Sequence, residues 1–197
     1  MPLASDNFKD LMSIVETINF KRDPSKLLEF LTEGDFFVAP ASAFYHGNFE
    51  GGLYNHCKHV YNILIHLNKL LPEKNKFSEE SLFYVSFCHD LCKINNYKIV
   101  EKWKKDKFGK WEAYNAYEEQ ETFPCGHATK SIVLALPLVS LTKEEIVAIR
   151  YHMGSFMEID NYSNRIYSDA RQFSYLTTML QSADIIASDI FEEIKKY

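Results

Sequence analysis

Histidine and aspartate residues fall on several helix faces that the sequence otherwise makes apolar. On a helix expected over residues 55–71, His56 points down the centre of the apolar stripe formed by Val60, Ile63, Leu64, Leu67 and Leu71. His89 shares the apolar face of the next helix, Asp90 follows it directly, and Asp184 lies inside the stripe of the last helix. A buried ionised carboxylate is costly unless it is paired or binds a metal. Imidazole and carboxylate together are typical ligands of a divalent transition metal.

Two further histidines extend this set. His127 opens a helix after Gly126, and His152 ends the helix that precedes Gly154. Taken singly, each residue has another interpretation, because a histidine on an apolar face is often a hydrogen-bonded core residue and an aspartate often a salt-bridge or capping partner. Six such ligands, with one aspartate able to bridge, suit two ions rather than one. We therefore expect one or two divalent ions, namely Mn, Fe, Ni, Co or Zn, with Mg as an alternative.

The phrases that contain these residues resemble the HD superfamily of metal-dependent phosphohydrolases. The matching phrases are GGLYNHCKHV, FCHDLCK and LQSADIIAS, while FPCGHATKS and IRYHMG resemble the segments that supply second-metal histidines in binuclear members. The run from about residue 35 to 188 is similar to stand-alone bacterial and phage-associated HD proteins labelled as hydrolases. APASAFYHGNFEGGLYNH also resembles the lead-in of HD domains in certain 3′→5′ exoribonucleases.

Two features depart from these relatives. Cys92 stands where the common HDIGK phrase has glycine. The first 35 residues are too short for the OB-fold with which those exoribonucleases bind RNA. The resemblance therefore implies the fold and the metal ligands, but not an RNA substrate.

The resemblance also implies roles for individual residues. One metal would be bound by His56, His89, Asp90 and Asp184, and the second, bridged by Asp90, would be completed by His127 and His152. Asp90 and Lys93 would be the catalytic residues of a phosphohydrolase that acts on a nucleotide or another small phosphoester. Lys93 would offer its ammonium to the substrate phosphate, and its alternative role is to stabilise a helix C-terminus.

Two other residues are candidates for binding substrate. His46 lies in an irregular segment and could contact phosphate at the mouth of the site, or it is a surface-loop residue. Arg150 could reach a phosphate, or it is a solvated helix residue. His59 and His66 we interpret as structural.

Two other classes of function stay open. Some HD proteins with the same ligands hold a di-iron centre and oxidise carbon substrates with O₂, and a non-catalytic module could bind a phosphorylated ligand. Lys93 favours hydrolysis over oxidation, and a binding module has no need of a complete set of ligands for two metals.

Mostly helical elements must position these residues. The spacing of apolar residues predicts helices over about 8–18, 24–34, 55–71, 78–92, 126–138, 142–154 and 168–197, an irregular segment over 35–54, and a β-hairpin over 97–118 that turns at 106–109. The expected fold class is mainly α, an HD-domain helical bundle with a β-hairpin insertion near 97–118. We expect a single domain over 1–197, with 1–34 as an N-terminal helical extension.

The hairpin combines lysines with Trp103, Phe108 and Trp111. Such a combination can hold single-stranded nucleic acid or a nucleotide base. The alternative is a solvated hairpin whose aromatic rings pair across the strands.

Composition limits the remaining classes. The chain has 197 residues, 46% of them hydrophobic and 25% charged, and a net charge of -5, which excludes disordered and collagen-like classes and argues against general polyanion binding. No uninterrupted apolar run reaches the length of a membrane span, and the start has no signal pattern, so we expect a cytoplasmic protein without membrane contact. The expected partner is a small phosphorylated substrate, nucleic acid stays open, and a homodimer through the first helix is an alternative to core packing of that helix.

Overall fold

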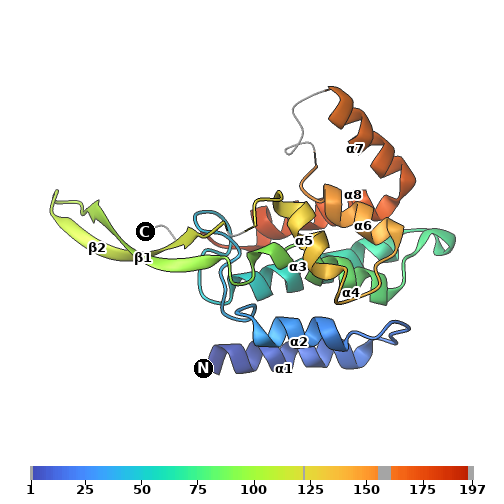
Figure 1. Cartoon of the computed structure of the whole chain (residues 1–197), viewed down its shortest axis with the longest axis horizontal. Coiled ribbons are helices and arrows are strands. Elements are labelled where there is room, and N and C mark those ends of the chain that lie inside the picture. The colour runs from blue at the N-terminus through green and yellow to red at the C-terminus, as the bar shows by residue number, and fades with distance from the viewer. Residues whose placement is uncertain (1, 122, 155–160, 195–197) are drawn as a thin grey trace.

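The chain folds into a mainly helical body with one two-stranded hairpin (Figure 1). In this computed structural model the described residues are 2–121, 123–154 and 161–194. The helices are α1 (Pro2–Thr17), α2 (Ser25–Glu33), α3 (Gly52–Leu70), α4 (Glu79–Cys88), α5 (His127–Ala135), α6 (Lys143–Tyr151), α7 (Asn161–Phe173) and α8 (Tyr175–Ile186). The strands are β1 (Tyr97–Lys105) and β2 (Trp111–Glu119). The expected class, mainly α with a hairpin near 97–118, is confirmed.

The core lies between α3 and the helices around it. α3 packs against α4 and α8, and α6 packs against α8 and α5. α1 and α2 form a layer below this body (Figure 1) and bury Leu11, Leu27 and Leu31 in the same hydrophobic cluster. A group of aromatic rings in edge-to-face or tilted contact fills the centre, formed by Phe36, Phe37, Tyr54, Phe83 and Phe87.

Local sequence signals fix several helix ends. The Ser78 hydroxyl accepts a hydrogen bond from the Ser81 backbone N–H and begins α4. Thr142 and Glu145 form the expected capping box at the start of α6. The hairpin is antiparallel, and Asp106 Oδ1 accepts backbone hydrogen bonds from Phe108 and Lys110 to stabilise the turn.

Two expected helices end or break differently. The helix expected to reach Cys92 ends at Cys88, and the chain continues as a short 3₁₀ turn over Leu91–Lys93. Asp90 leaves helical geometry, with φ -116° and ψ 20°, so Asp90 and Lys93 extend from a turn beyond the helix end rather than from one helical face.

The expected last helix is two helices separated at Ser174, whose φ of -151° and ψ of 130° are extended. A π-helical turn over Ala187–Phe191 follows α8. The side chains of Phe173, at the end of α7, and Phe191, at the end of the π-helical turn, are 54% and 58% exposed. No helix within the described ranges is both long enough and apolar enough to cross a membrane.

Candidate metal centre

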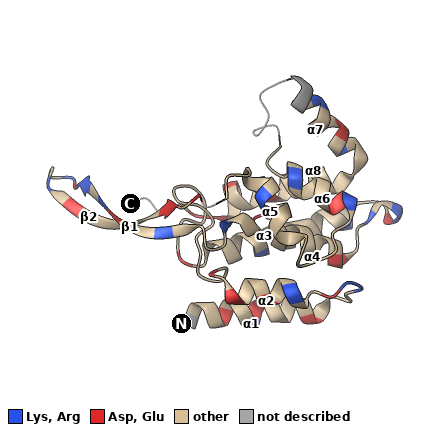
Figure 2. Ribbon diagram, viewed as in Figure 1, with Lys and Arg blue, Asp and Glu red and all other residues tan. Residues whose placement is uncertain are grey.

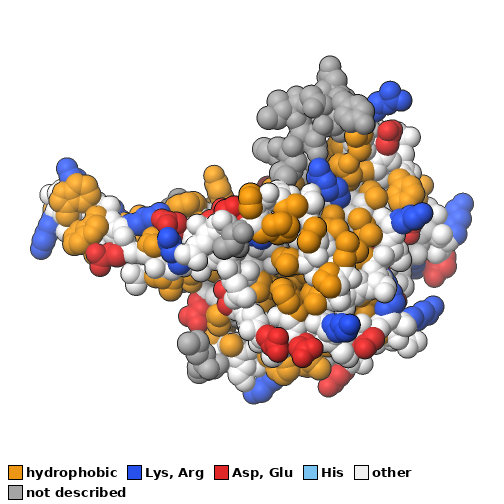
Figure 3. Space-filling view, in the orientation of Figure 1, with side chains coloured by type: hydrophobic (Ala, Val, Ile, Leu, Met, Phe, Trp, Pro, Cys, Tyr) orange, Lys and Arg blue, Asp and Glu red, His pale blue; other side chains and the backbone are white. Residues whose placement is uncertain are grey.

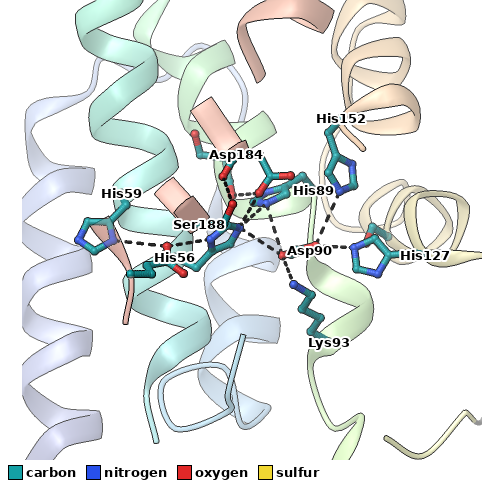
Figure 4. Close-up of polar contacts among 12 residues, drawn as sticks. His56, His59, His89, Asp90, Lys93, His127, His152, Asp184 and Ser188 are labelled. Atoms are coloured by element: carbon teal, nitrogen blue, oxygen red, sulfur yellow. Dashed lines mark hydrogen bonds and ion pairs between the residues drawn. The ribbon is translucent and has the colours of Figure 1, made fainter. Parts of the chain in front are cut away.

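The six expected ligands come from five helices or their ends and meet at one place (Figure 4). They lie in α3, in the turn after α4, at the first residue of α5, just beyond α6, and in α8, and they are His56, His89, Asp90, His127, His152 and Asp184. Helix faces in the sequence indicated His56, His89 and Asp184, and Asp90 follows His89 directly. His127 and His152 were added because they lie at helix ends, and the resemblance implied that all six form one centre.

One group of donors surrounds the Nε2 atom of His56. This atom lies 3.1 Å from His89 Nε2 and 3.1 Å from Asp184 Oδ1. The Oδ2 atom of Asp90 lies 3.5 Å from the same two histidine nitrogens. Four candidate donor atoms from three segments of the chain therefore lie close together around His56 Nε2.

A second group surrounds the other oxygen of Asp90. Asp90 Oδ1 lies 2.6 Å from His127 Nε2 and 3.9 Å from His152 Nε2. The two carboxylate oxygens of Asp90 thus face two different sets of histidines. This is the arrangement that a bridging aspartate requires.

Hydrogen bonds on the far side of each imidazole fix which nitrogen is a donor. Nδ1–H of His89 donates to the Ser86 carbonyl at 2.8 Å, and Nδ1–H of His152 donates to the Ile149 carbonyl at 2.7 Å. Nδ1 of His56 lies 2.9 Å from Glu192 Oε1. With Nδ1 protonated, the Nε2 lone pair of each ring is available to the cluster, as in histidines that bind metals.

Burial and charge set the protonation of the cluster. Burial lowers the pKa of His89 to about 3 and also lowers the pKa of His152, so both rings are neutral at pH 7. Burial alone would raise the pKa of Asp90, but Lys93 and the neighbouring histidines lower it well below its usual value. Neutral imidazoles beside an ionised carboxylate are the protonation states that metal binding needs.

Two histidines carry protons in the absence of a cation. Burial lowers the pKa of His56, but hydrogen bonds with Asp184 and Glu192 outweigh burial and raise it to about 9. Burial likewise lowers the pKa of His127, and Asp90 raises it to about 10. The positive charges of these two protonated rings balance the negative charges of the neighbouring carboxylates. A bound cation would supply the same positive charge in their place. The donor set therefore fits a divalent metal.

Lys93 lies at the edge of the cluster. Its Nζ atom is 2.7 Å from Asp90 Oδ2, and its side chain is 12% exposed. Burial lowers the pKa of Lys93, but the charge of Asp90 raises it, so the side chain is an ammonium at neutral pH.

Two residues of the centre were missing from the sequence-based prediction. Glu192 follows the π-helical turn, has a side chain that is 2% exposed, and contacts both His56 and, at 3.4 Å, His59. Cys92 Sγ lies 3.3 Å from His127 Nδ1. The signal for Cys92 was its departure from glycine, and the signal for Glu192 was its place eight residues after Asp184, near the same face of the expected last helix.

The remaining candidates lie at different distances from the cluster. The His46 ring is half-buried, with its centroid 5.0 Å from that of His56, so His46 belongs to the centre rather than to an exposed loop. The Arg150 guanidinium lies over the Tyr151 ring, 5.0 Å from its centroid, and its contact with substrate stays a prediction. His66 Nδ1 donates to the Asn62 carbonyl at 2.7 Å, as a structural residue would.

The chain was compared with protein-family models, curated proteins and solved structures, and none of the three comparisons gave a match. The function must therefore be argued from the cluster itself. The structure establishes a mainly helical fold with a buried His/Asp cluster whose donors could hold a metal.

Proposed function

We propose that this protein is a metal-dependent phosphohydrolase of the HD type, acting on a nucleotide or another small phosphoester. The observation that carries the proposal is the environment of Asp90. One of its oxygens faces His56 and His89, the other faces His127, and Lys93 Nζ lies 2.7 Å from Oδ2. A bridging carboxylate beside a buried ammonium suits the handling of a phosphate.

The chain offers ligands for up to two ions. One would be held by His56, His89, Asp184 and one oxygen of Asp90, and a second by His127, His152 and the other oxygen of Asp90. Bound divalent ions supply Lewis acidity and lower the pKa of coordinated water toward neutrality. Glu192 and the carbonyl groups of Ser86 and Ile149 would keep the imidazoles in the correct tautomer.

Lys93 would bind and orient the substrate. An ammonium has three N–H donors, and Asp90 uses one of them, so the others can donate to phosphate oxygens. Because the pKa of Lys93 is raised, the ammonium keeps its charge throughout the neutral range. His46, whose ring lies beside that of His56, would also contact the substrate.

Charge balance supports an anionic substrate. The carboxylates of Asp90, Asp184 and Glu192 are matched by three positive groups, which are Lys93 and the protonated rings of His56 and His127. Exchange of two protons for two divalent ions would leave the centre with a net positive charge. A phosphate dianion would restore neutrality.

The test combines metal content with phosphate release. Purified protein should contain transition metal, and with Mn²⁺, Co²⁺, Ni²⁺ or Mg²⁺ it should release phosphate from at least one member of a panel of nucleotides and phosphoesters. Asp90→Asn should lose most of the metal and all turnover, because an amide is a poor ligand and cannot bridge two ions. Asp189→Asn, at an exposed position near Asp184, is the matched control and should change neither.

Three results would count against the proposal. If Asp90→Asn retains metal and activity, Asp90 is a structural residue. Turnover that strictly requires iron and O₂ would instead indicate the oxygenase alternative. Tight binding of phosphorylated ligands without turnover by fully metallated protein would indicate a binding module.

A further inference from the structure

The hairpin is an arm that extends away from the helical body (Figure 1). β1 begins four residues after Lys93, and β2 ends eight residues before His127, so both strands connect directly to the candidate metal centre. Each strand has nine residues, which at ~3.3 Å per residue gives an arm about 30 Å long. An isolated two-stranded ribbon is only marginally stable, because it buries little surface. The length of this arm therefore points to a role beyond the stability of the fold.

The aromatic rings at the free end of the arm do not pair with each other across the strands. Trp103 lies opposite Ala113, and Trp111 lies opposite Lys105. Trp103, Phe108 and Trp111 are 59%, 83% and 58% exposed, and within the described residues none of their rings contacts another aromatic ring. Cross-strand aromatic pairing, the structural alternative for this hairpin, occurs between Tyr97 and Tyr117 nearer the body, with ring centroids 6.4 Å apart, but not among these three rings at the free end.

Trp103, Lys105 and Trp111 lie on one face of the arm. Residues directly opposite each other in an antiparallel pair share a face, and alternate residues of one strand do so as well. Lys105 lies opposite Trp111 and two residues after Trp103, so the three side chains form one patch. The Lys105 ammonium is 5.3 Å from the centroid of the Trp111 ring.

The free end is also strongly basic in a protein of net charge -5. Residues 102–111 contain five lysines and a single acid, Asp106, whose Oδ1 accepts backbone hydrogen bonds in the turn. Lys104 pairs with Glu112 at 3.1 Å on the opposite face, whereas in the described chain no carboxylate lies within 4 Å of Lys105, Lys107 or Lys110. Figure 2 shows basic residues at this end of the hairpin, and Figure 3 shows hydrophobic and basic side chains lying together there.

We propose that the free end of the arm binds single-stranded nucleic acid. Unpaired bases would stack on Trp103, Trp111 and Phe108, and the lysines without carboxylate partners would contact the phosphates. A base pair in a duplex has no free face for such stacking, so the strand must be single. A membrane surface fits less well, because insertion of the turn would bury Asp106, Lys107 and Lys110 among lipid chains.

Binding is measured on the full chain by fluorescence anisotropy with fluorescein-labelled twelve-residue oligo(U) and oligo(dT). The double variant Trp103→Ala/Trp111→Ala should lower affinity for both oligonucleotides, by about tenfold for each ring removed. The triple variant Lys105→Gln/Lys107→Gln/Lys110→Gln should reduce the slope of log affinity against log salt concentration by about 2. Because these side chains lie outside the core, circular dichroism should match that of the unmodified protein.

Lys104→Gln is the matched control, since it removes the same charge from an ion pair on the other face and should weaken binding less than Lys105→Gln. The binding assay requires no turnover, so a failure of the proposed hydrolysis leaves this test intact. The proposal is overturned if the unmodified protein does not bind, if the tryptophan variant binds equally well, or if a blunt duplex binds better. It is also overturned if the tip residues instead mediate binding to phosphatidylserine vesicles or self-association in sedimentation.

Discussion

Three histidines of the centre, His56, His89 and His152, are oriented by a hydrogen-bond partner of their Nδ1 atom. These partners differ in how strongly they accept a hydrogen bond. His89 and His152 use carbonyl groups of their own helices, three residues back along the chain. His56 uses the carboxylate of Glu192, which comes from a segment 136 residues later. A carboxylate partner makes an imidazole more basic and a better ligand. We infer that Glu192 is a positioning residue for His56.

Substitution of Glu192 should weaken metal binding without removing a ligand. Glu192→Ala should lower metal affinity by about 10- to 100-fold, and Glu192→Gln by less, because its amide oxygen still accepts from Nδ1 of His56. Isothermal titration with Mn²⁺ measures the difference. Glu193→Gln, at an exposed neighbouring position, is the control. Equal affinity in all three variants would show that Glu192 does not position His56.

The residues that sequence analysis found and missed differ in a physical way. His56 and His89 lie on regular helices, where periodicity identifies buried positions. Glu192 lies eight residues after Asp184, a spacing that keeps two residues near one face of a regular helix, but it follows a π-helical turn rather than a regular helix. The role of Cys92 depends on a turn after α4 that periodicity does not reveal.

At the scale of elements, the start of α3 is fixed by a close approach of two backbones. Gly51 has φ of 82°, in the left-handed region that favours glycine. A Cβ atom on Gly52 would lie 1.9 Å from the carbonyl oxygen of Gly47, next to His46. The two glycines that precede His56 in the sequence thus allow the loop containing His46 to pack against the helix containing His56.

Gly52→Ala should therefore destabilise the protein. The added methyl group must displace the loop at residue 47, and overpacking of this kind costs about 1–3 kcal/mol. Chemical denaturation monitored by circular dichroism gives the free energy of unfolding. Gly109→Ala is the control, because nothing lies within 4 Å of its added methyl group and only the backbone conformation, φ 80°, is strained. A larger loss at Gly109 than at Gly52 would contradict this interpretation.

Periodicity was reliable for elements with one apolar face and failed where helices end or break. It found α3, α6 and the hairpin close to their actual bounds. It extended the last helix across Ser174, because the apolar residues on both sides continue one helical spacing although the backbone at Ser174 is extended. Spacing in the sequence reports which face is apolar and carries little information about backbone angles at a break.

At the scale of the whole molecule, Arg22 links the N-terminal layer of α1 and α2 to the helical body through ion pairs. The Arg22 guanidinium contacts both carboxylate oxygens of Glu145, at 2.6 and 2.8 Å, and its Nε lies 3.3 Å from Glu80. The Glu80 carboxylate also accepts hydrogen bonds from the backbone N–H groups of Lys21 and Arg22. Because Glu145 also caps α6, the layer of α1 and α2 is connected to two helices that position the metal ligands.

Glu80 should make stability depend on pH in a defined direction. Burial alone would raise the pKa of Glu80, but hydrogen bonds from the backbone and side chain of Arg22 outweigh burial and lower it below its usual value. The unfolded chain titrates near the ordinary value of ~4.3. A depressed pKa in the folded state stabilises the protein above the unfolded value, and this stabilisation is lost as the pH falls through the folded value.

The difference in free energy of unfolding between the unmodified protein and Glu80→Gln isolates this contribution, since other carboxylates titrate in both. We expect a difference of about 1–3 kcal/mol at pH 7, the cost of disturbing a buried charged hydrogen-bond network. The difference should stay constant down to about pH 5 and shrink below about pH 4. Urea denaturation across this range measures it, and the exposed Glu33→Gln should stay within about 0.5 kcal/mol of the unmodified protein throughout. A difference that grows on acidification would mean that Glu80 is protonated in the folded protein at neutral pH, and the ion pair with Arg22 would not hold the N-terminal layer in place.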